Sequence, residues 1–496
     1  MESTLVAIDA GTTGVSCVLF DAALAPLAHA YREFEQHYPQ PGWVEHDAAQ
    51  ILAAVDATLA EIAGHPLAAR AAGLGITNQR ETVFALERSS GRALRHGIVW
   101  QDRRTAARCA ELRGAGHEPF LAQATGLRLD PYFSATKIEW MLRADAQLAR
   151  RAQRGEVVFA TVDGLIARHL SGLPEVVTDP TNASRTLLYD LEAQNWNQRA
   201  CELFAIESGW LPRVVASSGS LGRIAAGHPL HGLPILGLAG DQQAALLGHG
   251  GTRAGALKLT FGTGCFLLLH TGAARARAPD GFLGTLALGP GGSVCHALEG
   301  SVFVGGALVQ FLRDQLGFFE RSSDSEALAR QAPDSGGVHF VPAFAGLGAP
   351  YWDPDARGAI LGLTRGTTRA QITRAALEAI AFQNTELLEM LRDIDGVPLG
   401  ELRVDGGAVG NQLLMELQAD YCGLPIVRTP IAAATARGAA ALAGFAAGLW
   451  PGGEVPPARG EARRFEPRLD PAERARRLRG WRAAVQRVRS QDRQSG

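Results

Sequence analysis

Two stretches of the chain place apolar segments on either side of a turn made of small residues. In the first, the apolar residues 4–9 and 15–21 flank the turn "AGTTG". In the second, residues 256–270 hold two apolar segments around the turn "GTG". Short apolar segments joined by glycine-rich turns are typical of β-hairpins. The pattern therefore predicts the same strand–turn–strand unit twice.

Other stretches repeat apolar residues at the spacing of an α-helix. They cover residues 135–150, 369–391 and 411–423. Thr368 begins a capping box before the second stretch, and Asp470 followed by a proline predicts the start of a C-terminal helix. The apolar run 438–450 is too short for the about 20 residues that span a bilayer, so we expect a core helix and no membrane insertion. The chain is predicted to be α/β.

Length and charge limit the domain organisation and the partner. A chain of 496 residues exceeds what one hydrophobic core usually holds, so we expect two or three domains. If each hairpin opens a domain, the boundary falls near Gly250, with an N-terminal domain 1–250 and a C-terminal domain 251–496. A net charge of −2 provides no field that attracts nucleic acid, so a small-molecule partner is favoured.

The cysteines and the N-terminus indicate the cytoplasm. The 6 cysteines are far apart in the sequence and form no CxxC pair, so reduced thiols are expected. The first residues carry an acid at position 2 and lead directly into an apolar strand, which is unlike a signal peptide.

The two hairpin turns offer a chemistry that suits phosphate. Glycines let backbone amides approach an anion closely, and threonine hydroxyls add further donors. A third glycine cluster follows a short strand within residues 402–420 and precedes a helix whose N-terminus could face an adenosine or a phosphate. Each turn alone is also compatible with a purely structural role. No GxxxxGK[ST] motif occurs, so these are not P-loops.

Several apolar segments end in polar groups. Residues 237–250 place Asp241 and two amides within a glycine, alanine and leucine run, and residues 75–86 hold a similar polar group after an apolar strand. Leaving such groups buried without partners costs about 1–3 kcal/mol each. With the aromatic residues Trp100, Tyr132 and Phe266, these groups would suit a small polyhydroxylated ligand. Asp241 is then predicted to face the ligand as a general base toward a hydroxyl.

The sequence resembles the FGGY carbohydrate kinases almost from end to end, and within them the members that phosphorylate glycerol. Ten segments in family order carry the resemblance: residues 75–82, 98–105, 130–140, 161–166, 178–191, 237–248, 261–272, 298–314, 341–368 and 402–411. The resemblance implies two ribonuclease-H-like, actin-like ATPase domains around a central cleft for ATP and substrate. The polyol site and first phosphate loop would lie in the N-terminal domain, and the second phosphate loop and adenosine site in the C-terminal domain.

The resemblance also implies the function and the site residues. ATP would phosphorylate glycerol to sn-glycerol 3-phosphate, with Asp241 as the catalytic base, and the protein would be a homodimer or homotetramer. The residues implied for the polyol are Arg80, Glu81, Trp100, Tyr132, Asp241, Gln242 and Phe266. Those implied for the nucleotide are Thr12, Thr13, Gly262, Thr263, Gly306, Gln310, Gly407 and Asn411. Asp9 and Asp241 are the acids implied near Mg²⁺.

The first loop departs from the family pattern. Members that phosphorylate glycerol usually read "DQGTTSSR" here, whereas this chain reads "DAGTTGVS" from Asp9 to Ser16. The arginine that would approach the transferred phosphate is missing. A kinase of another polyol or of a ketose such as xylulose is therefore an alternative. An actin-like ATPase that transfers no phosphate is a further alternative, although it would not require the complete polyol set.

Two histidines lie in the segment just before the motif that contains Asp241. His228 and His231 are expected to be surface loop residues rather than a phosphorylation site.

Overall fold

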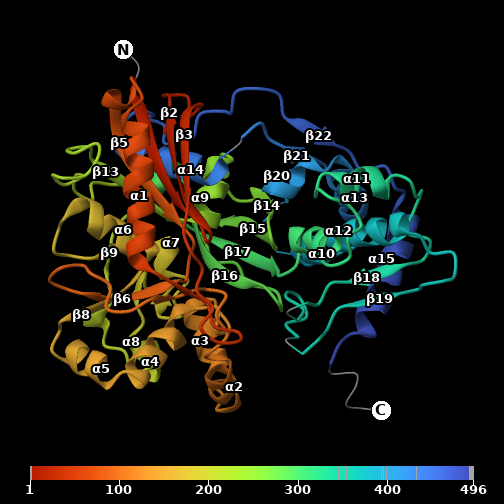
Figure 1. Ribbon diagram of the computed structural model, residues 1–496, viewed down its shortest axis with the longest axis horizontal. Helices are drawn as coiled ribbons and strands as arrows, with labels where there is room; N and C mark the ends of the chain where they lie inside the picture. The colour runs from red at the N-terminus through yellow and green to blue at the C-terminus, as the bar shows by residue number, and fades with distance from the viewer. Residues whose placement is uncertain are drawn as a thin grey trace.

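Two β-sheets of matching topology organise the computed structural model, which describes residues 3–490 apart from residues 345, 354, 393, 395, 398 and 432 (Figure 1). The first sheet has the strand order β13-β5-β1-β2-β3. Its strands are β1 (Thr4–Ala10), β2 (Gly14–Phe20), β3 (Pro26–Glu33), β5 (Ala71–Asn78) and β13 (Ile235–Gly240).

The second sheet has the strand order β16-β17-β15-β14-β20-β21-β22. Its strands are β14 (Leu257–Phe261), β15 (Cys265–Gly272), β16 (Leu283–Leu288), β17 (Val294–Val302), β20 (Leu402–Asp405), β21 (Ile426–Arg428) and β22 (Arg463–Phe465).

The two predicted hairpins are the centres of these sheets. β1 pairs antiparallel with β2, and β14 pairs antiparallel with β15. In the first sheet, β1 also pairs in parallel with β5, and β5 pairs in parallel with β13. In the second sheet, β14 pairs in parallel with β20, and β20 pairs in parallel with β21. The predicted repeat of the strand–turn–strand unit is thus confirmed. The repeat also includes the two parallel strands beside each hairpin.

Smaller strands complete the sheets of the described chain. A third sheet has the order β4-β7-β6-β8, and three strand pairs are separate from it. Their bounds are β4 (Glu45–His46), β6 (Val83–Glu87), β7 (Gly97–Ile98), β8 (Val157–Thr161), β9 (Val177–Thr178), β10 (Tyr189–Asp190), β11 (Asn195–Trp196), β12 (Arg213–Val214), β18 (His339–Val341) and β19 (Ala359–Leu361).

Helices cover the sheets. In the first half of the chain they are α1 (Ala48–Ala63), α2 (Ala106–Gly114), α3 (Glu118–Thr125), α4 (Ser134–Ala144), α5 (Ala146–Gln153), α6 (Val162–Ser171), α7 (Pro180–Ala183), α8 (Gln198–Leu203) and α9 (Asp241–Gly248). In the second half they are α10 (Gly306–Asp314), α11 (Asp324–Ala329), α12 (Arg369–Leu391), α13 (Gln412–Cys422), α14 (Ala434–Ala446) and α15 (Pro471–Gln486).

The predicted caps are present, and one predicted helix is divided. Thr368 and Gln371 form the capping box of α12, and Asp470 caps α15. The stretch 135–150, predicted as one helix, breaks at Asp145. This residue is extended (φ −133°, ψ 97°), and its side chain accepts the backbone N–H groups of the next helix, α5. Aspartate is a strong N-cap, so a new helix begins there.

The first sheet is buried on both faces. On one face, Ile8 and Leu19 pack in a core with residues of α1 and α6. The other face packs against α14, the predicted core helix. α14 comes from near the C-terminus and is drawn in blue beside the first sheet (Figure 1). An added Cβ on Gly75 of β5 would collide with the backbone oxygen of Ala439 in α14, and one on Gly438 in α14 with that of Ala244 in α9, so glycine is needed for both close approaches. Among the described residues, no helix is both long and apolar enough to cross a membrane.

Candidate active site

The carboxyl ends of three parallel strands bring the polar segments together. Ala10, Asn78 and Gly240 end β1, β5 and β13, and they lie in register across the sheet. The "GTT" turn, the polar residues 79–82 and helix α9 follow directly. Ligand sites of α/β sheets form at such carboxyl edges. The sequence predicted each polar segment separately, and the sheet places them side by side.

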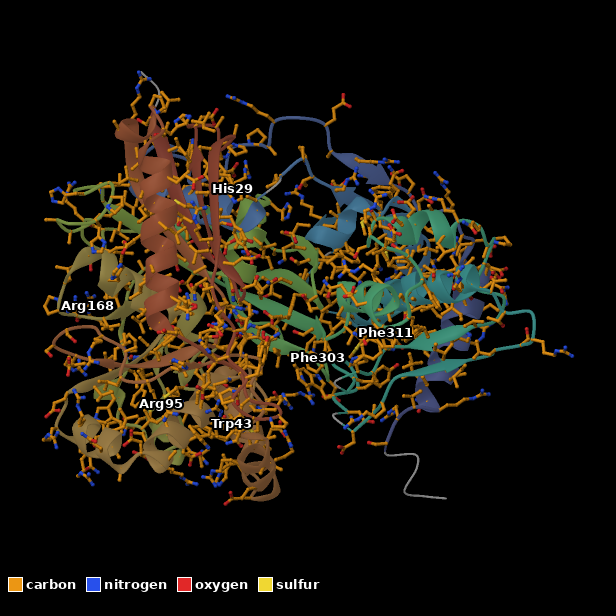
Figure 2. All side chains as sticks on the ribbon, viewed as in Figure 1. His29, Trp43, Arg95, Arg168, Phe303 and Phe311 are labelled. Carbon is orange, nitrogen blue, oxygen red and sulfur yellow. The ribbon has the colours of Figure 1, made fainter. Side chains whose placement is uncertain are left out.

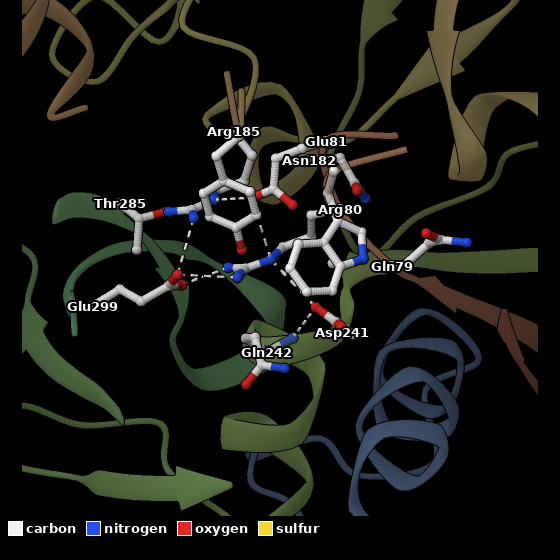
Figure 3. Close-up of polar contacts among 12 residues, drawn as sticks. Gln79, Arg80, Glu81, Asn182, Arg185, Asp241, Gln242, Thr285 and Glu299 are labelled. Carbon is white, nitrogen blue, oxygen red and sulfur yellow. Dashed lines mark hydrogen bonds and ion pairs between the residues drawn. The ribbon is translucent and has the colours of Figure 1, made fainter. Parts of the chain in front are cut away.

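Arg80 is the centre of this group (Figure 3). Its Nε lies 3.2 Å from Oδ1 of Asp241 and 3.8 Å from Oε1 of Glu81. The Arg80 side chain is 2% exposed, whereas that of Asp241 is 30% exposed. Glu81 has a positive φ of 65°, a conformation that costs a non-glycine residue about 1–3 kcal/mol and that concentrates at functional sites. Asp241 is therefore held by a buried cation while part of its carboxylate stays accessible.

Two buried charges that sequence reasoning missed complete the ion pairs. Glu299 on β17 accepts from Arg80 at 2.6 and 3.1 Å and from Arg185 at 2.9 Å. Arg185 also donates to Oε1 of Glu81 at 2.6 Å. Burial raises the pKa of Glu299, but the guanidinium groups of Arg185 and Arg80 outweigh it and hold the pKa at about 2. We call Arg80, Glu81, Arg185 and Glu299 the charge network. It joins the segment that follows β5 of the first sheet to β17 of the second sheet.

The amides after Asp241 have different surroundings. Gln243 is buried, accepts from Arg80 at 3.2 Å and donates to Thr285 at 3.3 Å. Gln242 accepts at 2.6 Å from Nζ of Lys258, a buried residue of β14 whose pKa is lowered by burial. Gln243 is thus satisfied inside the fold, whereas Asp241 remains open to a ligand.

The three predicted aromatic residues lie together. The rings of Trp100 and Tyr132 meet edge to face with centroids 5.6 Å apart, and those of Trp100 and Phe266 at 6.4 Å. The guanidinium of Arg185 lies 5.6 Å from the Tyr132 ring centroid, which connects the aromatic residues to the charge network. Phe266 belongs to β15 of the second hairpin. Both sheets therefore contribute to one site, in which the rings adjoin the charge network whose Arg80 holds Asp241.

Residues predicted for phosphate lie in the two hairpin turns. Thr12 accepts a hydrogen bond from Nε1 of Trp100 at 3.0 Å, which brings the first turn to the aromatic residues. Thr13 and Thr263 are exposed at the tips of their turns. Gly306 begins α10, and its N–H donates to the carbonyl of Gly262 at 2.8 Å. Helix α10 therefore begins directly at the second turn.

The remaining residues predicted for the nucleotide lie on α10 and beside α13. Gln310 is exposed on α10, and Gly407 has open space where a Cβ would stand. Asn411 is the N-cap of α13: its Oδ1 accepts from the backbone N–H of Leu414 at 2.9 Å, and its Nδ2 donates to Ser325 at 3.3 Å. The structure thus gives the Asn411 side chain a capping role that the sequence analysis did not predict.

The two acids predicted near Mg²⁺ are electrostatic neighbours. Asp9 lies near the end of β1, where burial and the negative charge of Asp241 raise its pKa to about 7. Mg²⁺ favours carboxylate oxygens and is commonly held by one or two carboxylates together with substrate phosphates. A cation between these acids would relieve their repulsion, so the pair fits such an ion.

Comparisons with known proteins identify the class. The model of the FGGY family of carbohydrate kinases, N-terminal domain, matches residues 4–248, and that of the C-terminal domain matches residues 257–447. The chain belongs to the FGGY family of carbohydrate kinases. The chain has the two actin-like domains of that family, and each of the two large sheets belongs to one of them. The predicted fold class is confirmed.

Within the family, the similar proteins include glycerol kinases. The glycerol kinase of Aromatoleum aromaticum is 50% identical over 98% of this chain and 99% of its own length. The glycerol kinase of Stenotrophomonas maltophilia strain R551-3 is 47% identical over 97% of both. The crystal structure of Plasmodium falciparum glycerol kinase with ADP matches with a TM-score of 0.90 and 30% identity over 98% of each chain. The xylulose kinase of Rhodospirillum rubrum matches with a TM-score of 0.82 and 25% identity over 98% of this chain and 99% of that one.

Proposed function

We propose that the protein transfers the γ-phosphoryl group of ATP to a terminal hydroxyl of glycerol, giving sn-glycerol 3-phosphate and ADP. The observation that carries the proposal is Asp241, which Arg80 holds at 3.2 Å while 30% of its side chain stays exposed. The rings of Trp100 and Phe266 lie against each other, with centroids 6.4 Å apart, and such rings suit the carbon edge of a polyol. Glycerol kinases at 47–50% identity over nearly the whole chain support glycerol as the acceptor.

In the proposed reaction Asp241 accepts the proton of the terminal hydroxyl as that oxygen attacks the γ-phosphorus in line. The new O–P bond forms while the bond from the γ-phosphorus to the bridging oxygen breaks, and ADP leaves. Arg80 and Glu81 orient the polyol hydroxyls, together with Gln242, while Tyr132 and the other rings exclude water.

The residues proposed for ATP lie on both hairpin turns and on the segments that follow the second sheet. Thr12, Thr13 and the Gly262–Thr263 turn would contact the phosphates, and Gly306, Gln310, Gly407 and Asn411 would line the remainder of the nucleotide site. Mg²⁺, held by Asp9 and Asp241 when bound, would neutralise phosphate charge. The ADP named in the structure of the Plasmodium relative supports the nucleotide.

A kinase of a ketose such as xylulose is the second candidate, favoured by the altered loop at Gly14, Val15 and Ser16. ADP release by the purified protein, measured across a panel of polyols and ketoses, separates the candidates. We expect the highest kcat/KM with glycerol. A higher kcat/KM with a ketose would replace the proposal, and ADP release that no acceptor stimulates would favour an ATPase without phosphoryl transfer.

Restoring the family's loop arginine with Ser16→Arg is expected to raise kcat on glycerol about tenfold and to change KM little. Ser16 pairs directly with Asp9, so both side chains lie on one face of the sheet. It is partly exposed and hydrogen bonds at 3.3 Å to His29, which Figure 2 labels on the first sheet, so an arginine there would not be buried in the core. A guanidinium near the transferred phosphate would act on charge that develops in the transition state.

Ser16→Gln is the control for this variant, because its side chain is also long and polar but carries no charge. Steady-state kinetics and a melting curve are measured on both. Unchanged or lower kcat in Ser16→Arg together with a lower Tm would show that residue 16 points into the core, and would imply that another residue supplies the positive charge.

We also propose a cytoplasmic homodimer or homotetramer. The cysteines are free and mostly buried, as expected of a protein in a reducing compartment. The small net charge provides no attraction for nucleic acid, so we propose no nucleic-acid partner. Light scattering of the purified protein tests the oligomeric state.

A further inference from the structure

A cluster of three metal-ligating side chains lies apart from the proposed active site. Asp56 comes from α1, His169 from α6, and His228 from the segment that precedes β13. Nε2 of His169 lies 2.9 Å from one Asp56 carboxylate oxygen, and Nδ1 of His228 lies 2.9 Å from the other. One potential ligand atom from each residue can be chosen so that all lie within 4.8 Å of one another.

His228 lies in a loop, as the sequence analysis predicts, but its side chain is only 18% exposed. It packs edge to face against His169, with ring centroids 4.5 Å apart. His231 is exposed, as expected. The His169 and Asp56 side chains are 23% and 36% exposed. The cluster is thus formed by packing of three elements, while an ion could still reach it from solvent.

We infer that Asp56, His169 and His228 form a binding site for a divalent transition metal ion of the zinc class. Two imidazole nitrogens and a carboxylate oxygen are a known donor set of three-ligand Zn²⁺ sites, whose fourth position is taken by water or another ligand. A neutral histidine can move its proton to the other ring nitrogen, which frees a lone pair toward the ion.

The distances suit a small shift into tetrahedral coordination. With metal–ligand distances of about 2.0–2.2 Å, neighbouring ligand atoms of a tetrahedral site lie roughly 3.3 Å apart. The carboxylate oxygen that binds the ion already lies 2.9 Å from the nitrogen of one histidine, a distance that needs to lengthen by only a few tenths of an ångström. The nitrogen of the other histidine, which bonds to the second oxygen, has to approach from within 4.8 Å. Rotation of the two imidazole rings brings their nitrogens closer from a separation within 4.8 Å.

The metal site would stabilise the N-terminal half of the protein without taking part in phosphoryl transfer. It ties α1 and α6 to the segment that leads into β13, and Asp241 follows the far end of that strand. The strand has 6 residues and rises roughly 20 Å, so the segment that contains His228 and the segment that begins with Asp241 leave it at opposite ends. Figure 2 labels Arg168, the neighbour of His169, on the side of the molecule away from the second sheet.

The test uses untagged full-length protein that has been dialysed against a chelator. Co²⁺ is titrated into it in excess Mg²⁺ and followed by visible absorption, because four-coordinate Co²⁺ absorbs much more strongly than the hydrated ion. Asp56→Asn and His169→Gln are measured in parallel. His231→Gln is the matched control, because it removes an exposed histidine close to His228 in the sequence.

We expect wild type and His231→Gln to bind one Co²⁺ per chain and to show a higher Tm with Zn²⁺. Loss of a direct ligand should weaken binding by more than the about 10–100-fold typical of a lost outer-shell partner, and the Zn²⁺-dependent rise in Tm should disappear. Glycerol phosphorylation in Mg²⁺ should be unchanged in Asp56→Asn.

Wild type that binds no Co²⁺, or variants that bind it as well as wild type, would overturn the inference and leave the cluster as a hydrogen-bonded clamp. If one variant fails to fold, the other variant and the wild-type titration still decide the question.

Discussion

Replacing Asp241 by asparagine is expected to lower kcat by a factor of about 10²–10⁴. The amide has nearly the same shape as the carboxylate but cannot accept the proton of the attacking hydroxyl. The residues proposed for ATP lie mostly on other segments, and Asp9 still offers a carboxylate to Mg²⁺, so ATP binding should change little. Steady-state ADP release with glycerol measures the first effect, and calorimetric titration with ATP measures the second.

Asp145→Asn is the matched control for this substitution. Asp145 caps α5 by accepting the N–H groups of Gln147 and Leu148, and asparagine serves equally well as an N-cap, so the control should keep both stability and kcat. ATP hydrolysis without glycerol should also fall in Asp241→Asn. If Asp241→Asn keeps more than about a tenth of wild-type kcat, a different group accepts the proton.

Local patterns were sufficient to predict much of the fold. The hairpins around residues 10–14 and 262–264, the helix 369–391 and the caps at Thr368 and Asp470 all depend on residues close together in the sequence. The packing of α14 on the first sheet could not be read in this way, because its partners are hundreds of positions earlier in the chain. Apolar periodicity indicates that a helix is buried but not against what.

The same limit explains which parts of the site were missed. The family resemblance supplied the residues proposed to face a polyol, such as Arg80 and Asp241, because it assigns a role to those positions. Glu299 and Arg185 form buried ion pairs around Arg80. They are 219 and 104 positions from their partners Arg80 and Glu81, which follow β5. Glu299 is an acid within an apolar strand, which indicates that a buried cation must pair with it. A single sequence does not show which cation that is.

Glu299→Gln is expected to destabilise the protein by about 3–5 kcal/mol, because it leaves two buried guanidinium groups without their shared charged acceptor. The side chains of Glu299 and Arg185 are fully buried, and that of Arg80 is 2% exposed, so water cannot replace the lost contacts. Arg80 would also be free to move relative to Asp241, so KM for glycerol should rise. Urea unfolding measures the stability, and steady-state kinetics measures KM.

The pH dependence separates loss of this charge from a change in packing. The folded-state pKa of Glu299, about 2, lies below its ordinary value of 4.5, so its stabilising effect is present above pH 4.5 and is lost as the pH falls toward 2. The difference in unfolding free energy between wild type and Glu299→Gln should therefore shrink over that range. Glu175→Gln, which breaks the exposed pair with Arg213, should cost less than about 1 kcal/mol. A Glu299→Gln penalty as small as that, or one independent of pH, would mean that the charge network does not join the two sheets energetically.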